Sequence, residues 1–152
     1  MNLFRVLEIS GSALLAERER AEVVTSNLAN AETTHSAEGG PYQRMHVVFG
    51  AQSMLAPSTN AGAFPATLAS FTDMHAEGVH VERVVADGAP PVRRFEPGHP
   101  DADDQGYVSY PAINPVEEMV NLMGAARAYQ LNASAVQSTK NMIQSSIDII
   151  KS

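Results

Sequence analysis

The chain contains no cysteine and no tryptophan, and acidic residues outnumber basic ones. Without cysteine, the chain cannot form disulfides, thiol-based catalytic sites or Cys-based zinc sites. Its 10 Lys and Arg residues against 17 Asp and Glu residues give a formal net charge of -7. This balance argues against binding to a nucleic-acid backbone and against a basic helix at a membrane surface.

Long hydrophobic segments are also missing. No apolar run approaches the roughly 18 residues that mark a transmembrane helix. The charged side chains Arg5, Glu8, Glu17 and Arg18 interrupt the first segment. We therefore expect no cleaved signal peptide, and any export would need a route that does not use one.

Three groups of residues resemble parts of metal-binding or catalytic sites, but none of the groups contains all the residues that such a site needs. His75, His80 and Glu82 provide too few ligands in a suitable arrangement for a metal. Residues 101–106 resemble the start of a calcium loop, but Ala112 occupies the position of the bidentate glutamate. The acidic residues of that stretch could supply an acid–base pair for sugar hydrolysis, yet no tryptophan is present to line a sugar site.

Phosphate-binding loops, dinucleotide-binding glycine motifs and nucleophile elbows do not occur either. We therefore predict no catalytic residues, no cofactor and no metal site. We also predict that neither a nucleic acid nor a small-molecule substrate is a partner.

The chain does contain heptad patterns at both ends. Near the C-terminus, two rows of residues recur every seven positions: Met119, Ala126, Ala133, Lys140 and Ile147, then Leu122, Tyr129, Val136, Ile143 and Ile150. These rows form an a/d seam of about five heptads. A further row is Ala128, Ala135, Met142 and Ile149, which indicates a second neighbour unless the alanines only raise helix propensity. Near the N-terminus, the rows are Leu7, Leu14, Ala21 and Leu28, and, more weakly, Leu3, Ser10, Glu17, Val24 and Ala31.

Helices with such seams pack against other helices, and seams at both ends of a small protein favour packing between subunits. The side chains that we predict to contact other subunits are Leu7, Leu14, Val24, Asn27, Leu28, Asn30, Met119, Leu122, Tyr129, Val136, Met142, Ile143, Ile147 and Ile150. Because Ser10, Gly11 and Glu17 weaken the N-terminal seam, we expect that helix to be marginal alone and to fold on docking.

The predicted fold is mainly α, with long terminal helices that form a coiled-coil-like axial domain. Three parts are expected: an N-terminal helix with its terminator in 1–34, a middle region in 35–113, and a C-terminal helix in 114–152. Asn114 is a suitable N-cap for the second helix, and Pro115 suits its first position.

The middle region is predicted to hold short strands and a small irregular β-hairpin. Alternating residues in 42–49 and 79–85 predict two strands, the second with a bulge or an end near Arg83. The segment 92–95 is predicted to pair with 79–85 across a Gly-Pro turn. Residues 50–76, rich in Ala, Ser, Thr, Gly and Pro, are predicted to be a flexible loop.

Several of these segments resemble the flagellar basal-body rod family. Residues 24–34, centred on Ser-Asn-Leu-Ala-Asn-Ala at 26–31, look like the N-terminal signature shared by rod and hook proteins. Further segments resemble the proximal-rod members of that family: 39–42 with 47–49, 97–103 with 106–108, and 116–121 with 128–130. Residues 50–76 match no motif of the family.

The resemblance implies a structural subunit of the proximal rod, which joins the rotor in the membrane to the hook and filament. Its implied partners are its own copies, other proximal-rod proteins, the adaptor between rod and export gate, the distal-rod protein, and the flagellar type III export apparatus. The implied location is the basal-body rod, in the periplasmic space of a two-membrane cell. In this family the terminal helices pair as coiled coils along the inner wall, and the middle segment faces outward.

Three alternatives remain at this stage. The chain could be another rod or hook subunit, although the Gly-His-Pro-Asp segment at 98–101 favours the proximal rod. A secreted coiled-coil adaptor or chaperone of a type III system would not need the Asn-Leu-Ala-Asn motif at 27–30, and such a protein is more often cytosolic. A cell-wall hydrolase is the weakest alternative, because no residues form a case for catalysis.

Overall fold

The computed structural model describes residues 3–37, 39–52 and 78–151. Within these ranges, two helices flank a middle region that contains two pairs of short antiparallel strands. The elements in chain order are α1 (Leu3–Ala29), β1 (Met45–Gln52), β2 (Gly78–Ala86), β3 (Val92–Phe95), β4 (Tyr107–Tyr110) and α3 (Pro115–Lys151). The predicted fold class, long terminal helices around a small β-containing middle, is confirmed.

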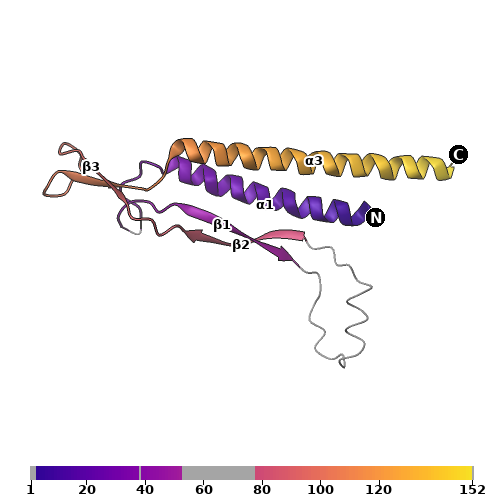
Figure 1. Cartoon of the computed structure of the whole chain (residues 1–152), viewed down its shortest axis with the longest axis horizontal. Coiled ribbons are helices and arrows are strands. Elements are labelled where there is room, and N and C mark those ends of the chain that lie inside the picture. Colours follow the sequence, from indigo (N-terminus) through magenta and orange to yellow (C-terminus); the bar gives the residue numbers. More distant parts are fainter. Residues whose placement is uncertain (1–2, 38, 53–77, 152) are drawn as a thin grey trace, which may run out of the picture.

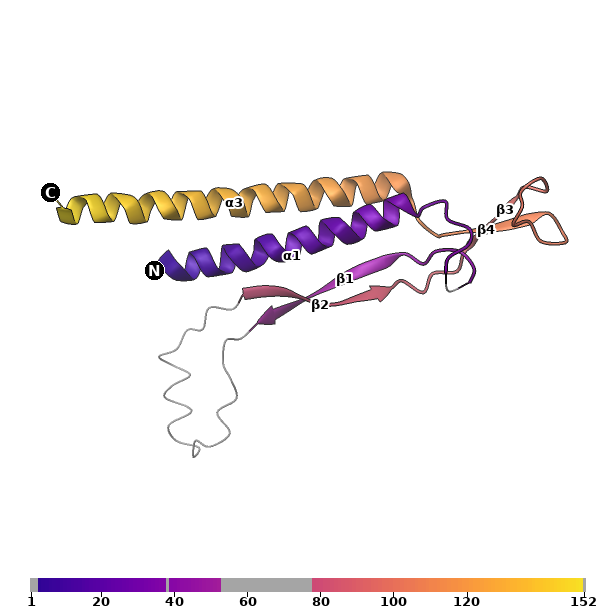
Figure 2. The same cartoon turned by 180° about the vertical axis from the view of Figure 1, so that it is seen from behind.

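The elements form three layers, with α1 between α3 and the β1–β2 ribbon (Figure 1). The two helices run antiparallel, so both chain ends lie at one end of the molecule. The β3–β4 pair lies at the opposite end (Figures 1 and 2). Since α3 has 37 residues and α1 has 27, α3 extends past the start of α1 by about 15 Å at 1.5 Å per residue.

The start of α3 has the predicted cap, and a side chain also caps the end of α1. The Asn114 side-chain oxygen accepts a hydrogen bond from the amide of Val116 at 3.0 Å, and Glu117 lies in the first turn of α3. At the end of α1, the Asn30 side-chain amide donates to the carbonyl of Ser26 at 2.9 Å. These bonds satisfy backbone groups that a helix end otherwise leaves without partners.

The predicted pairing of the middle strands is wrong. β2 pairs with β1, from Met45 opposite Ala86 to Gln52 opposite Gly78, whereas β3 pairs with β4. The connection between β2 and β3 contains two successive prolines, at 90 and 91, which hold the backbone extended and prevent a tight reversal. The chain therefore continues to the far end of the molecule before it forms the second pair.

Two boundaries also differ from the sequence prediction. β1 begins at Met45 and continues to Gln52, so residues 50–52 of the predicted loop belong to a strand. The remainder of that loop, from 53 to 76, lies outside the described residues. The predicted bulge is confirmed, because the register changes between Val48 opposite Arg83 and the next pair and leaves Glu82 as an extra residue.

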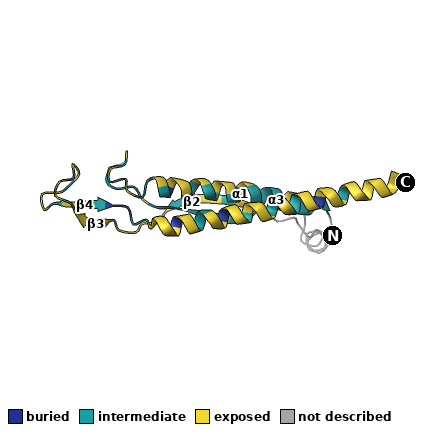
Figure 3. Cartoon of the chain, turned by 90° about the horizontal axis from the view of Figure 1, so that it is seen from above, coloured by how far each residue is buried: buried dark blue, intermediate teal, exposed yellow. Residues whose placement is uncertain are grey.

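Few apolar side chains in the described residues are buried. They are Ala16, Val24, Val108, Tyr110, Pro111 and Ala125, and they are accompanied by the buried polar residues Ser10, Asn27, Glu118 and Thr139. Figure 3 shows that most of α3 is exposed or only partly covered. A core of this size gives a single subunit little hydrophobic stabilisation.

The β1–β2 ribbon contacts α1 at the start of β2. The Ser12 hydroxyl accepts a hydrogen bond from the amide of Val79 at 3.1 Å and donates to the carbonyl of Ile9 at 2.9 Å. A Cβ atom on Gly78 would lie 2.9 Å from the Ser12 hydroxyl oxygen, so a glycine is needed there. This contact keeps the ribbon on the helix.

The segment that resembles part of a calcium loop forms the turn between β3 and β4. One Asp103 carboxylate oxygen accepts hydrogen bonds from the amides of Gln105 and Tyr107, at 2.9 and 2.8 Å. The bond from the Tyr107 amide is the main cause that holds the pKa of Asp103 below its usual value. The carboxylate thus serves the turn itself, and Gly106 completes it with a φ of 80°.

We expect the substitution Gly106→Ala to destabilise the β3–β4 pair by about 1–2 kcal/mol. The positive φ is unfavourable for alanine, and the new Cβ would lie 3.0 Å from the Phe95 ring and 3.1 Å from Pro97. Amide hydrogen exchange in β4 would report the loss. The control is Gly98→Ala in the same loop, where no atom lies within 4 Å of the added Cβ. Equal exchange rates in the two variants would contradict the prediction.

Candidate functional site: a polar junction and an exposed helix face

Asn27, near the end of α1, is 2% exposed and makes four side-chain hydrogen bonds. Its amide nitrogen donates to the Met45 carbonyl at 2.8 Å and to a Glu118 carboxylate oxygen at 3.1 Å. Its oxygen accepts from the Met45 amide at 2.9 Å and from the Tyr42 hydroxyl at 3.1 Å. One carboxamide therefore uses its full hydrogen-bonding capacity to join α1, β1 and α3.

Glu118, in the first turn of α3, is 1% exposed and is paired with Arg44. Its second carboxylate oxygen accepts hydrogen bonds from both Nε and Nη2 of Arg44, the former at 3.0 Å, and from Asn121 at 3.3 Å. Arg44 also contacts Glu117 at 3.1 Å and Asp87 at 3.8 Å. Burial lowers the pKa of Arg44, but the hydrogen bonds and charges of Glu118 and Glu117 outweigh burial and raise the pKa above its usual value.

We call the group Asn27, Tyr42, Arg44, Met45 and Glu118 the polar junction. Asn27 and Glu118 are 91 residues apart in the chain, and here they share a hydrogen bond. Each hydrogen bond in the junction forms only when its donor and acceptor lie at the right distance and angle. The junction therefore sets the position of α1 along the axis of α3. A buried, satisfied polar network of this kind specifies one arrangement where apolar packing alone would allow several.

The residues that follow Asn27 bring the chain back to the junction. The Thr33 hydroxyl donates to the Asn30 side-chain oxygen at 3.1 Å, and the Thr33 amide donates to the Asn30 carbonyl at 3.1 Å. The Tyr42 amide then donates to the Thr33 carbonyl at 3.1 Å, which places the Tyr42 hydroxyl against Asn27. The Asn-Leu-Ala-Asn motif therefore ends α1 and fixes the return of the chain.

The predicted subunit-contact residues fall into three groups in the structure. Val24 and Asn27 are buried within the chain. Half-buried are Leu7, Leu14, Leu28, Asn30, Leu122, Val136 and Ile143. Exposed are Met119, Tyr129, Met142, Ile147 and Ile150. The contact with other subunits stays a prediction, and it applies most directly to the exposed group.

The face that α3 turns toward α1 lies one residue before the predicted seam. Glu118, Ala125 and Thr139 are each 1% exposed, whereas Met119 is 54% exposed. Alanine and threonine are small enough for two helices to approach closely, and the Thr139 hydroxyl is satisfied by the Ala135 carbonyl at 2.9 Å. Glu118 is held inward by the polar junction, so Met119 lies outside, whereas Leu122, Val136 and Ile143 are half-buried.

Sequence reasoning missed a compact apolar surface at the start of α3. Val116, Met119, Val120 and Met123, which we call the outer stripe, are all more than half exposed. Only Met119 belonged to the predicted contacts. The sequence does contain a pattern that predicts this surface, because these four residues have the i, i+3, i+4, i+7 spacing of one helix face.

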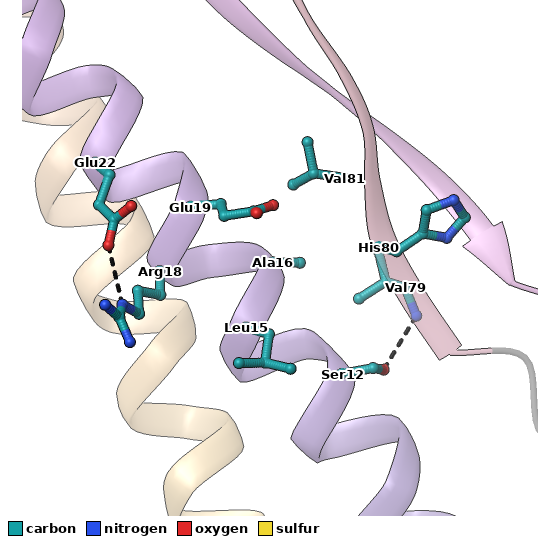
Figure 4. A pocket seen from close by; sticks show the side chains of 9 residues that line it. All are labelled: Ser12, Leu15, Ala16, Arg18, Glu19, Glu22, Val79, His80 and Val81. Carbon is teal, nitrogen blue, oxygen red and sulfur yellow. Dashed lines mark hydrogen bonds and ion pairs between the residues drawn. The ribbon is translucent and has the colours of Figure 1, made fainter.

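An open groove of about 490 Å³ lies between α1 and β2 (Figure 4). Leu15 and Ala16 line it from the helix, and Val79 and Val81 line it from the strand. Glu19 extends toward the strand, whereas Arg18 and Glu22 form an exposed 3.0 Å ion pair on another side of the helix. The lining has few polar groups that converge on one point, which is not the arrangement that a small-molecule site needs.

Of the residues considered for a metal, His80 and Glu82 lie in β2, and His75 lies outside the described residues. Across the described ranges, no three His, Asp or Glu side chains are placed to hold a metal ion. In the same ranges, neither helix combines the length and the apolar character that crossing a membrane would require.

Comparison with known proteins agrees with the resemblance seen in the sequence. The model for "Flagella basal body rod protein" matches residues 7–34, and the model for "Flagellar basal body rod FlgEFG protein C-terminal" matches residues 104–149. Proteins named flagellar basal-body rod protein FlgC are similar over nearly the whole chain. That of Escherichia coli O6:H1 is 38% identical over 94% of each chain. That of Bacillus subtilis is 34% identical over 99% of this chain and 100% of the relative, and that of Borreliella burgdorferi is 34% identical over 99% of each.

The chain belongs to the FlgC family of flagellar basal-body rod proteins. The first matched region contains Asn27, and the second contains Glu118. The polar junction therefore joins the two parts of a FlgC chain that the family models describe.

We expect Asn27→Ala to lower the free energy of unfolding by about 3 kcal/mol. The change leaves the Met45 amide and carbonyl, the Tyr42 hydroxyl and a Glu118 oxygen without their partner. Urea unfolding at a fixed protein concentration would measure it. The matched control is Asn132→Ala on α3, whose side chain donates only to the Ala128 carbonyl, and its expected effect is within about 0.5 kcal/mol. Similar losses in both variants would refute the central role of Asn27.

Arg44→Gln should cost about 3 kcal/mol, because it leaves the Glu118 carboxylate buried without its cation. The same substitution at Arg18 serves as the control, since the Arg18–Glu22 pair is 71% and 62% exposed at its two side chains. Exposed pairs on a helix contribute about 0.3–0.5 kcal/mol. Thermal unfolding of both variants would separate the two effects, and a small loss at Arg44 would contradict the interpretation.

Proposed function

We propose that this chain is a structural subunit of the proximal rod of the bacterial flagellum, and that it helps to transmit torque from the rotor toward the hook. The supporting observation is the similarity to FlgC proteins over 94% or more of both chains. The architecture is compatible with this role, because the chain is elongated (Figure 1) and the groove between α1 and β2 is open.

The distribution of apolar side chains supports assembly with other subunits. Large apolar residues remain exposed along α3, from Val116 to Ile150, while the fully buried core is small. Exposed apolar surface on this scale marks an interaction surface. Neighbouring subunits that cover it would stabilise the folded chain, so stability and assembly would be linked by mass action.

Torque transmission requires that a subunit does not shear internally. In this chain the resistance would come from the polar junction, which ties both helices and the β1 strand at one end of the molecule. Hydrogen bonds and a buried ion pair are directional, so sliding of α1 against α3 would break them. Apolar contacts alone would resist such sliding less.

The remaining partners follow from the family rather than from contacts in this chain. They are the chain's own copies, the other proximal-rod proteins, the adaptor between rod and export gate, the distal-rod protein and the flagellar type III export apparatus. The proposed place is the rod, within the periplasmic space of a two-membrane cell. Export in an unfolded state is compatible with the small core, because little stability would have to be overcome.

The proposal predicts that deletion of the gene abolishes motility and that the tagged protein copurifies with detergent-extracted hook–basal bodies. A short epitope inserted within residues 53–77 leaves every described element uninterrupted. A tagged cytosolic protein in the same cells is the control for contamination. Retention of the tagged chain in the cytosol, with normal motility after deletion, would refute a role in the rod.

A further inference from the structure

The β3–β4 pair is a two-stranded sheet, and no other described helix or strand contacts it. All four residues of β3 are exposed. An isolated two-stranded sheet is only marginally stable in water, because one of its faces usually needs a packing partner. In this chain one face is packed, since Val108 and Tyr110 are at most 8% exposed.

The other face of the pair presents an ordered aromatic surface. The rings of Phe95 and Tyr107 meet edge to face with their centres 5.3 Å apart. The Arg93 guanidinium lies 4.9 Å from the centre of the Tyr107 ring and is held by Asp103. We call Arg93, Phe95 and Tyr107 the hairpin face. It is preorganised, yet Phe95 is 63% exposed.

The outer stripe is a second exposed surface, and its side chains are chemically complementary to the hairpin face. It offers two methionines and two valines on one side of α3. Methionine sulfur makes favourable contacts with aromatic rings, and its flexible side chain adapts to a flat partner. Both surfaces lie at the end of the molecule away from the chain termini (Figure 1).

Opposite charges lie beside the two surfaces. Asp104 stands in the turn that leads to Tyr107, and Arg127 follows Met123 by about one helical turn. Both side chains are exposed, and neither has an ion pair with another described residue. An unpaired acid therefore borders the hairpin face, and an unpaired base borders the outer stripe.

We propose that the hairpin face of one copy docks on the outer stripe of a second copy, with Asp104 of one chain facing Arg127 of the other. This inference rests on the proposed function and names the surfaces through which two copies meet. A second copy is the favoured occupant because one chain supplies both complementary surfaces. Since the two surfaces differ, the contact is heterologous and can continue from copy to copy instead of closing a dimer.

The test uses the absence of cysteine in this chain. The variant Gln105→Cys/Gln130→Cys places one thiol beside each surface without changing any residue of the hairpin face or the outer stripe. It would replace the native protein in cells, and isolated basal bodies would be treated with a short thiol crosslinker. We expect a ladder of dimers and higher species of this chain, whereas each single-cysteine variant stays monomeric.

The matched control is Gln105→Cys/Gln144→Cys, which moves the second thiol by about 21 Å along α3 at 1.5 Å per residue. It should give no ladder. The charge contact is tested in the first double-cysteine background. Asp104→Lys or Arg127→Glu alone should lower the crosslink yield about fivefold, and the two together should restore it.

The outcomes separate this inference from the proposed function. If the protein is in the basal bodies but forms no ladder, or crosslinks only within one chain or to a different protein, the docking of copies is refuted and the rod assignment stands. If the protein is missing from the basal bodies while they still assemble, the rod assignment fails, and the inference fails with it. Loss of the ladder in the charge variants without restoration in the pair would refute the Asp104–Arg127 contact.

Discussion

The arrangement of this chain depends on one buried carboxamide. Asn27 bonds to the backbone of Met45 on both sides and to Glu118, so it connects two helices and a strand that are far apart in the sequence. Glu118 in turn holds Arg44. Because a buried polar group without partners is costly, each element is held in the one position that satisfies all the others.

This polar connection explains how so small a core can specify one fold. The described residues bury few large apolar side chains, and the inner face of α3 carries Ala125 and Thr139 instead. Small residues let the helices approach closely, while many of the larger apolar side chains of α3 remain exposed. The result is a chain whose geometry is set internally, while much of the hydrophobic surface of α3 remains exposed.

Local signals in the sequence were sufficient for the helices. Asn114 and Pro115 mark the start of α3, and the asparagines near residue 30 mark the end of α1, because capping depends on neighbouring residues alone. Strand pairing was predicted incorrectly. Alternation identifies a strand but does not name its partner, so the segment at 92–95 was assigned to β2 when it pairs with β4.

Residues close together in the chain were enough to predict the helix-rich class, the cap of α3, the bulge beside Arg83 and the resemblance to the rod family. Tertiary structure alone decided which face of α3 is buried, and the answer was Glu118 and not Met119. A heptad pattern indicates which residues share a helix face. It cannot show that Asn27 on α1 will form a hydrogen bond that buries Glu118 of α3. The buried face of α3 is set by the hydrogen bond between Asn27 and Glu118, which are 91 residues apart in the chain.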